Sequence, residues 1–529
     1  MQAMPPSAAA AQDTLISALR AHLRSACGGP VELVETHISW VLLTPDHAYK
    51  LKKPVRLPFV DFSTLASRLH FCEEELRLNQ RLAPSLYLGV VPICGSVQAP
   101  RIDAGAAPIE YAVQMRRFPP GALLDELLHA RALGAAELAQ LAQRLADFHR
   151  AAPRRPPQAD FGTPAQVLQA VLNVLAQLQA LGDPARVVAL RAWIQEQAQS
   201  LHSVWLARRR DGAVRECHGD LHLSNAVRLG VGDVTAFDCI EFDPALRWTD
   251  VMADVGFLSM DLRAHGRADL ASGFVDDYLQ RSGDYAGLAV LRFYEVYRAL
   301  VRALVAALRA RGKGSVAAAG PDYLACAETL VHRAPGPARV LITQGLSGSG
   351  KSSVARQLLE ATGAVRLRSD VERKRLFGLD ALQRSASRGV DIYTAAATRS
   401  TVERLLQCAS TAVAAGYPVI VDAAFLRQDE RHAFRAAARR WGVPFAILEC
   451  RASVECLRAR VSARGTGGQD ASEADLAVLE RQLLFHQPLD EEERAVTIAL
   501  DTEQPLDLAA LCAAWRGQAD SRREQQGAG

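Results

Sequence analysis

The sequence has little net charge and very few lysines. Its 529 residues include 61 basic and 58 acidic side chains, a formal charge of +3, which gives no general electrostatic reason to bind nucleic acid or an anionic membrane. Only six basic residues are lysine, and the other 55 are arginine. A coding bias explains this scarcity in general, but a retained lysine can mark a place that needs a compact ammonium group.

Cysteine pairs and signal-peptide features are also absent. The ten cysteines include no CxxC pair, and no histidine cluster has zinc-site spacing, so we expect small buried residues in a reducing cytoplasm. The first residues, MQAMPPSAAAAQ, lack the basic and apolar regions of a signal peptide. These absences predict a cytoplasmic protein.

Long uncharged runs are interrupted. Phe161 to Gly182 contains five glutamine and asparagine residues, with valine and leucine at helical spacing, which predicts an amphipathic helix and no membrane span. The run from Leu405 to Val421 is broken at Gly416-Tyr417-Pro418, which separates a helix from a buried strand. We therefore expect no membrane segment.

The chain is long enough for two to four domains, and its clearest break is the Pro- and Gly-containing linker 334–338. In residues 1–333, short strands precede mostly helical sequence that a strand-loop-strand insert at 213–243 interrupts. This order suggests a bilobal kinase. In residues 339–515, apolar strands alternate with helices, which predicts a parallel sheet. We expect a flexible tail at 516–529.

Residues 345–352, GLSGSGKS, match the phosphate-loop (Walker A) pattern GxxxxGK[ST] between a predicted strand and helix. Glycines let successive backbone N–H groups point at phosphate oxygens, and the helix dipole adds to the attraction. The lysine would reach the β- and γ-phosphates and the next serine would hold Mg²⁺. A flexible turn is the alternative. The predicted nucleotide-binding residues are Gly345, Ser347, Gly348, Ser349, Gly350, Lys351, Ser352 and Ser353.

Two aspartates follow later strands of this region, at the sheet edge where ligands bind. Asp370 is predicted to accept the proton of an attacking hydroxyl, and Arg373 to bind an anionic part of the acceptor. The alternative for Asp370 is a plain helix cap. Asp422 is predicted to bind Mg²⁺ through water, with a plain strand-end aspartate as the alternative.

Three arginines, Arg458, Arg460 and Arg464, enter a Gly-rich run. They could close over the transferring phosphoryl group, in which case Arg460 and Arg464 bind nucleotide, or form a solvated helix face. On its phosphate loop and its Asp370-x-x-Arg373 pair, the region 339–515 resembles the small P-loop kinases of the zeta-toxin, polynucleotide-kinase and gluconate-kinase type. The resemblance implies phosphoryl transfer and leaves the acceptor open.

A second set of polar residues lies upstream, in ECHGDLHLSN (216–225) and FDCIEFD (237–243). A kinase catalytic loop needs a base, an amide that binds Mg²⁺ and a carboxylate for the metal. Asp220, Asn225 and Asp238 supply these in order, with ordinary Asx turns as the alternative. Residues of about 30–330 thus resemble aminoglycoside phosphotransferase-like kinases, whose catalytic loop carries HGD.

This resemblance extends to Ala48-Tyr49-Lys50, which is similar to the A-x-K of a kinase strand. Lys52 shares the face of Lys50 and is the second candidate, whereas Lys53 points away. The alternative is a solvated basic edge strand. The predicted partner of Lys50 is one of Glu73, Glu74 and Glu75, with Glu75 favoured. Where a glycine-rich loop would cover the phosphates, Leu33 to Leu43 contains no glycine.

Three further residues are predicted to support the catalytic loop: His218, Asp250 and Asp254. His218 is expected to be structural because Asp220 occupies the base position.

The predicted fold class combines α/β and α+β: an N-terminal bilobal protein-kinase-like fold and a C-terminal P-loop NTPase with a parallel sheet. The leading hypothesis is a bifunctional ATP- and Mg²⁺-dependent kinase that acts on hydroxyls of small molecules. One alternative is an ATP-driven switch with a degenerate N-terminal kinase. Another is a nucleic-acid end kinase, which the near-neutral charge disfavours.

Overall fold

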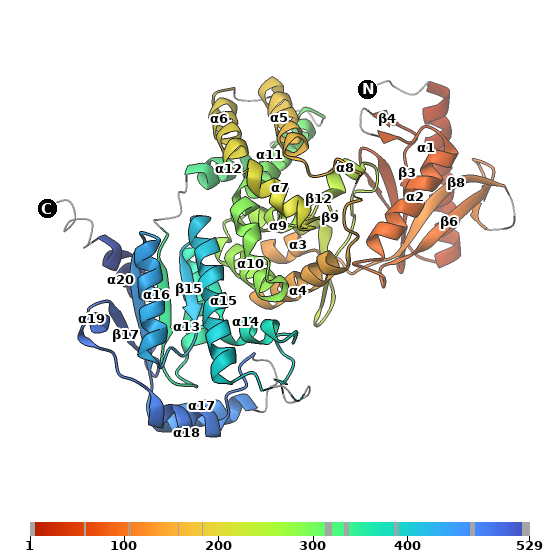
Figure 1. The fold of residues 1–529 in the computed structure, drawn as a ribbon. Helices are drawn as coiled ribbons and strands as arrows, with labels where there is room; N and C mark the ends of the chain where they lie inside the picture. Colours follow the sequence, from red (N-terminus) through yellow and green to blue (C-terminus); the bar gives the residue numbers. More distant parts are fainter. Residues whose placement is uncertain are drawn as a thin grey trace. The chain divides into compact units, whose positions relative to one another are not determined.

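The computed structural model describes residues 6–520 except 58–59, 104, 106, 157, 182–183, 313–319, 333–337, 386–388, 390 and 466–470. The chain divides into two units, Met1–Val167 with Leu206–Leu258, and Leu168–Trp205 with Ser259–Gly529 (Figure 1). All but one residue of the predicted linker 334–338 lies outside the described residues.

The first unit contains an antiparallel sheet of order β1-β2-β3-β8-β6-β7. Alternation along its strands sends side chains to two faces. One face packs against α1 in a core that includes Leu19, Trp40 and Leu51, and the other packs against α2 in a core that includes Ala48 and Cys72. These elements are β1 (Glu32–Glu35), β2 (Ser39–Leu43), β3 (His47–Lys52), β6 (Tyr87–Gly95), β7 (Pro100–Ile102), β8 (Pro108–Arg116), α1 (Pro6–Cys27) and α2 (Leu65–Asn79).

The rest of this unit surrounds the predicted catalytic loop. Two short antiparallel pairs, β10 with β11 and β12 with β9, flank the loop and fix where it begins and ends. The elements are β4 (Arg56–Leu57), β5 (Val60–Asp61), α3 (Leu124–His129), α4 (Ala135–Ala151), α7 (His202–Arg210), β9 (Val214–Glu216), η1 (Leu223–Asn225), β10 (Ala226–Gly230), β11 (Asp233–Ala236), α8 (Pro244–Arg247), β12 (Trp248–Asp250) and α9 (Met252–Ala264), which continues into the second unit.

The second unit contains a parallel five-stranded sheet of order β14-β15-β13-β16-β17. Every residue of the central strand β13 is buried, because helices cover both faces of the sheet. The parallel sheet predicted from the alternation of apolar strands and helices is present, and the predicted mixed α/β fold class is confirmed. The strands are β13 (Val340–Gln344), β14 (Val365–Arg368), β15 (Val419–Asp422), β16 (Phe445–Arg451) and β17 (Thr497–Asp501).

Helices of two regions of the sequence belong to this unit. One group precedes the sheet: α5 (Pro164–Leu181), α6 (Pro184–Ser200), α10 (Ala268–Ser282), η2 (Tyr285–Gly287), α11 (Leu288–Gly312) and α12 (Tyr323–His332). The other alternates with its strands: α13 (Lys351–Thr362), α14 (Ser369–Leu376), α15 (Ala395–Ala414), α16 (Gln428–Arg440), α17 (Val454–Gly465), α18 (Leu476–Phe485), α19 (Glu491–Arg494) and α20 (Leu508–Asp520).

Two features differ from the sequence-based expectations. The helix α1 was not predicted, although it forms one wall of the first sheet's core. The helix α20 extends to Asp520, so the flexible tail does not begin at residue 516. Trp515 anchors this end of the helix because its side chain is buried in the core and its carbonyl accepts a hydrogen bond from Arg339. Within the described part of the chain, no helix combines the length and apolarity that crossing a membrane requires.

Candidate functional sites

The first candidate site brings together the predicted base and the predicted metal-binding amide. The Nδ2 of Asn225 donates hydrogen bonds to the Asp220 carbonyl at 2.9 Å and to its Oδ2 at 3.2 Å. The Asn225 carbonyl accepts from the N–H of Phe237, the residue before Asp238, at 2.9 Å. Hydrogen bonding therefore joins the three sequence-predicted polar groups through the backbone of the loop and of the segment that follows β11.

Lys50 lies between two carboxylates at this site. Its Nζ is 2.5 Å from Oδ1 of Asp238 and 2.8 Å from Oε1 of Glu75. Burial opposes the charge of Lys50, but the two carboxylates raise its pKa well above the ordinary value. Of the three glutamates considered from the sequence, Glu75 is the one that reaches this lysine, because alternation along β3 turns Lys50 towards α2.

Lys52 makes a second, deeper bridge. Its side chain is completely buried and pairs with both Glu75 and Glu241. Burial alone would raise the pKa of Glu75, but the two lysines lower it, whereas burial prevails at Glu241 and raises its pKa. Lys53 pairs with Glu35 at the surface. The sequence analysis missed Glu241, although its place three residues after Asp238 was a usable signal.

Asp254 holds the backbone of the catalytic loop. Its carboxylate accepts hydrogen bonds from the N–H groups of His218 at 2.8 Å and Gly219 at 2.9 Å, and lies 3.1 Å from Nε2 of His149. Burial alone would raise its pKa, but the interaction with His149 and the contacts with His218 lower the pKa of Asp254 to about 2. The predicted supporting role of Asp254 thus has a direct geometric basis.

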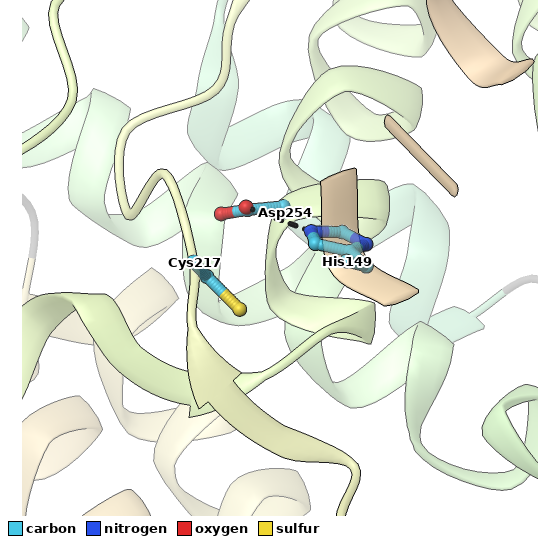
Figure 2. Close-up of side chains that lie close together, drawn as sticks. All are labelled: His149, Cys217 and Asp254. Atoms are coloured by element: carbon cyan, nitrogen blue, oxygen red, sulfur yellow. Dashed lines mark hydrogen bonds and ion pairs between the residues drawn. The ribbon is translucent and has the colours of Figure 1, made fainter. Parts of the chain in front are cut away.

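Figure 2 shows that His149, Cys217 and Asp254 gather in one buried cluster, a grouping that could suggest a metal site. Hydrogen bonds account for this cluster without a metal. The Asp254 oxygens accept from the N–H groups of the loop and lie beside His149 Nε2. The Cys217 thiol donates to the Thr249 carbonyl. His149 was not foreseen from the sequence because its partner lies 105 residues away.

His218 and Asp250, two of the predicted supporting residues, make different contacts, and only His218 contacts the loop. His218 lies within the loop: its Nε2 is 2.8 Å from the Phe237 carbonyl, its Nδ1 accepts from the Asp220 N–H, and burial lowers its pKa. Asp250, by contrast, pairs with Arg208 of α7 at 2.6 Å and accepts from the Met252 N–H. The prediction that Asp250 holds the loop directly is therefore wrong, because its carboxylate contacts α7 through Arg208 and the start of α9 through Met252.

The second candidate site is the phosphate loop between β13 and α13. Gly348 has a φ of +86°, and a Cβ there would lie 2.8 Å from the Leu457 carbonyl oxygen. Lys351 Nζ donates to the carbonyls of Gly345 at 2.8 Å and Leu346 at 2.7 Å. All the predicted nucleotide-binding residues from 345 to 353 lie on this loop or in the first turn of α13.

Two side chains from α17 and α18 reach the phosphate loop. Arg460 donates to Thr502 Oγ1 at 2.9 Å and to the Gly348 carbonyl at 3.4 Å. Gln482, which the sequence analysis did not single out, accepts a hydrogen bond from the Ser347 N–H at 2.8 Å. Arg458 instead pairs with Glu480 at the surface, and the side chain of Arg464 lies outside the described residues. Arg460 is therefore the one predicted arginine placed beside the loop among those described.

Asp422 at the end of β15 and Ser352 in the first turn of α13 fit a divalent cation. Ser352 Oγ donates to Asp422 Oδ1 at 3.1 Å. The other oxygen, Asp422 Oδ2, is buried and has no hydrogen-bond partner among the described residues. A hydroxyl and a carboxylate with an unsatisfied oxygen are the hard ligands that Mg²⁺ prefers, so these two side chains could hold the ion.

Asp370 and Arg373 belong to α14, beside this site. The helix begins at Ser369 after the N-cap residue Arg368, whose side chain makes no capping bond, so Asp370 is not a helix cap and that alternative is wrong. Arg373 donates to the Ile392 carbonyl at 3.1 Å and to Thr398 Oγ1 at 3.2 Å, and its guanidinium lies 5.3 Å from the Tyr393 ring centroid. Its Nε has no partner among the described residues.

Comparison with known proteins assigns a family to each region. Residues 60–294 match the model of the Phosphotransferase enzyme family, and residues 340–489 match that of an AAA domain. The uncharacterised protein Rv2004c of Mycobacterium tuberculosis strain H37Rv is 30% identical over 459 residues, which cover 85% of this chain and 89% of that protein. An uncharacterised protein of Mycobacterium bovis gives the same values.

Two solved structures also resemble parts of the chain. A gluconokinase from Sinorhizobium meliloti is 23% identical and covers 36% of this chain and 98% of its own, with a TM-score of 0.27. A choline/ethanolamine kinase family protein from Mesorhizobium loti is 14% identical and covers 60% of this chain and 93% of its own, with a TM-score of 0.33. Both likenesses are too weak to bear on function.

The role of Asp254 predicts a stability change. Because its folded pKa of about 2 lies below its ordinary 3.8, its stabilisation is present above pH 3.8 and is lost as the pH falls towards 2. We expect Asp254→Asn to lower the free energy of unfolding at pH 7 by about 2 kcal/mol, and by less at pH 3, in urea titrations. Asp233→Asn, which breaks a surface pair with Arg144, is the control, and an equal cost in both variants would contradict the prediction.

The close approach at Gly348 predicts a binding change. We expect Gly348→Ala to weaken ATP binding by about tenfold or more, because the new Cβ meets the Leu457 carbonyl in a loop already at positive φ. Gly378→Ala is the control, since that glycine has a φ of +66° with open space around it. Calorimetric titration with ATP distinguishes the two, and similar losses in both would count against a constrained phosphate loop.

Proposed function

Since this chain belongs to the family of the mycobacterial proteins that it matches and joins a phosphotransferase-family domain to an AAA domain, we propose that it is an ATP- and Mg²⁺-dependent kinase. It has two phosphate-handling sites, and each transfers the γ-phosphate of ATP to a hydroxyl of a small molecule. The observation that most supports this proposal is the contact of Lys50 with both Glu75 and Asp238, residues from three separate segments.

In the first site, each group has a separate task. Asp220 accepts the proton of the attacking hydroxyl, and Asn225 holds it by the hydrogen bond from Nδ2 to Oδ2. Asn225 and Asp238 hold Mg²⁺, which supplies neutralisation of charge on the phosphates. Lys50 would bind phosphate oxygens of the nucleotide, and Glu75, at 2.8 Å, would keep its ammonium oriented towards them.

In the second site, the phosphate loop binds the nucleotide through its N–H groups and Lys351, and Ser352 and Asp422 hold the metal. Asp370 takes the acceptor proton. Arg373 is held against Tyr393 and the Ile392 carbonyl, and it binds an anionic part of the acceptor. Arg460 supports the loop from α17.

One observation favours a second candidate, an ATP-driven switch with an inactive first domain. The turn between β1 and β2 contains no glycine, and the Thr36 hydroxyl accepts the N–H groups of Ile38 and Ser39. Those amides are therefore already used by the turn. If the first site binds no nucleotide, this candidate replaces the two-site kinase.

Nucleotide stoichiometry tests the two sites directly. We expect the full chain to bind two equivalents of a non-hydrolysable Mg²⁺·ATP analogue in calorimetry, and Lys351→Ala and Lys50→Met to bind one each, because each removes an ammonium at one site. Lys53→Ala is the matched control, since this neighbouring lysine pairs with Glu35 at the surface. One equivalent in the wild type, or an unchanged stoichiometry in Lys351→Ala, would contradict the two-site proposal.

Transfer of labelled γ-phosphate to a panel of hydroxyl metabolites tests the chemistry. We expect Asp220→Ala and Asp370→Ala to lower transfer at their own site by about 10²- to 10⁴-fold while nucleotide binding is retained. ATP consumption without labelling of any acceptor would favour the switch.

A further inference from the structure

A buried arginine links the metal-binding carboxylate of the second site to a helix that precedes the sheet. Arg366, on β14, is almost fully buried. Its Nη2 donates to Asp276 Oδ2 at 2.7 Å, and its Nη1 donates to the Ser352 carbonyl at 3.3 Å. The same Nη1 lies 3.9 Å from Asp422 Oδ2, which is too long for a hydrogen bond.

Asp276 lies far in the sequence from the other residues of the second site. It lies on α10, within the residues that match the Phosphotransferase enzyme family, whereas Arg366 and Asp422 lie within the AAA match. Helix α10 and the whole AAA match belong to the second unit, where α10 packs against α13. Gln280, one turn beyond Asp276, donates to the Arg366 carbonyl at 2.8 Å and fixes the same contact.

A buried guanidinium must be balanced by a carboxylate. Among the described residues, Arg366 has two carboxylates within 4.0 Å, those of Asp276 and Asp422. Asp276 forms the short bond, and Asp422 Oδ2 stays without a hydrogen bond, with Arg366 Nη1 at 3.9 Å and Arg368 Nε at 3.7 Å from it. Without the charge of Asp276, Asp422 would be the remaining counter-charge and would be drawn to Arg366.

We propose that Asp276 is a positioning residue for the second site: by holding Arg366 away from Asp422, it keeps that carboxylate free for Mg²⁺. The inference rests on the proposed function in one respect, that Ser352 and Asp422 hold the metal. By this inference, α10, a helix of the phosphotransferase-family region, contributes to metal binding at the phosphate loop. The Mg²⁺ affinity of that site therefore depends on both regions of the chain.

The chain provides a matched control in the next residue. Asp277 accepts hydrogen bonds from Arg356 at 2.7 Å and 3.0 Å, and no hydrogen bond joins it to Arg366 among the described residues. Arg356 also donates to Asp276 Oδ2 at 3.2 Å, so both variants lose a bond to this arginine and only Asp276→Asn loses the bond to Arg366. The experiment titrates Mg²⁺ against binding of a fluorescent ATP analogue to the full chain, and the signal that Lys351→Ala removes is assigned to the second site.

We expect Asp276→Asn to raise the Mg²⁺ concentration for half-maximal binding by about tenfold, while binding without Mg²⁺ is unchanged. Asp277→Asn should stay within about twofold of the wild type, because Asp277 forms its hydrogen bonds with Arg356 and leaves the bond from Arg366 to Asp276 in place. Adding Arg366→Met to Asp276→Asn should restore the wild-type Mg²⁺ dependence, because the guanidinium that loses its partner is gone, whereas Arg368, at 3.7 Å from Asp422 Oδ2, is the same in all these variants. Binding without Mg²⁺ separates this role from a merely structural one, because a variant damaged only by an uncompensated buried guanidinium would lose nucleotide binding with and without Mg²⁺.

Three results would overturn the inference: no shift in Asp276→Asn, an equal shift in Asp277→Asn, or no restoration by Arg366→Met. If Asp276→Asn does not fold, the single variant Arg366→Met tests the inference. We expect it to need no more Mg²⁺ for half-maximal binding than the wild type, and a higher requirement overturns the inference. If nucleotide binding by the wild type does not depend on Mg²⁺, the proposed function is overturned instead. The experiment thus distinguishes failure of the inference from failure of the proposed function.

Discussion

A buried positive charge needs a carboxylate beside it, and this requirement organises the first unit. The ammonium of Lys52 is out of contact with solvent and lies between Glu75 of α2 and Glu241 of the segment after β11. Glu75 also pairs with Lys50, which in turn pairs with Asp238. Opposite charges thus alternate through five side chains, and they tie together the sheet, the helix α2 and the segment that holds Asp238 and Glu241.

The same requirement acts in the second unit, with a different outcome. Arg366 lies within 4.0 Å of two carboxylates, those of Asp276 and Asp422, and forms its short bond with Asp276 of α10. In the first unit the carboxylate proposed to bind metal, Asp238, is paired with Lys50, whereas in the second unit Asp422 keeps an oxygen without a hydrogen bond. Under the proposed function, metal binding would require the loss of an ion pair at Asp238 but not at Asp422, so we expect the two sites to differ in their affinity for metal.

The sequence predicted the parts of the fold that local patterns determine. The strands of both sheets follow from alternation or from short apolar runs, and the phosphate loop follows from its glycines. The partners that complete each site could not be predicted in the same way. Glu241 and Asp276 reach their lysine and arginine only through tertiary packing, and His149 reaches Asp254 across 105 residues. Helix α1 was missed because its alanine-rich start carries little amphipathic signal.

The choice between lysine and arginine follows the directions in which the partners lie. At Lys52 two carboxylates converge on one point, and a compact ammonium can meet both. Lys374 likewise donates to the Ala381 carbonyl and pairs with Glu473 while almost fully buried. Arg366 instead has partners on separate nitrogens, which suits a planar fork. Surface Lys53 does not follow this pattern, so scarcity of lysine points to a site only where the ammonium is also enclosed.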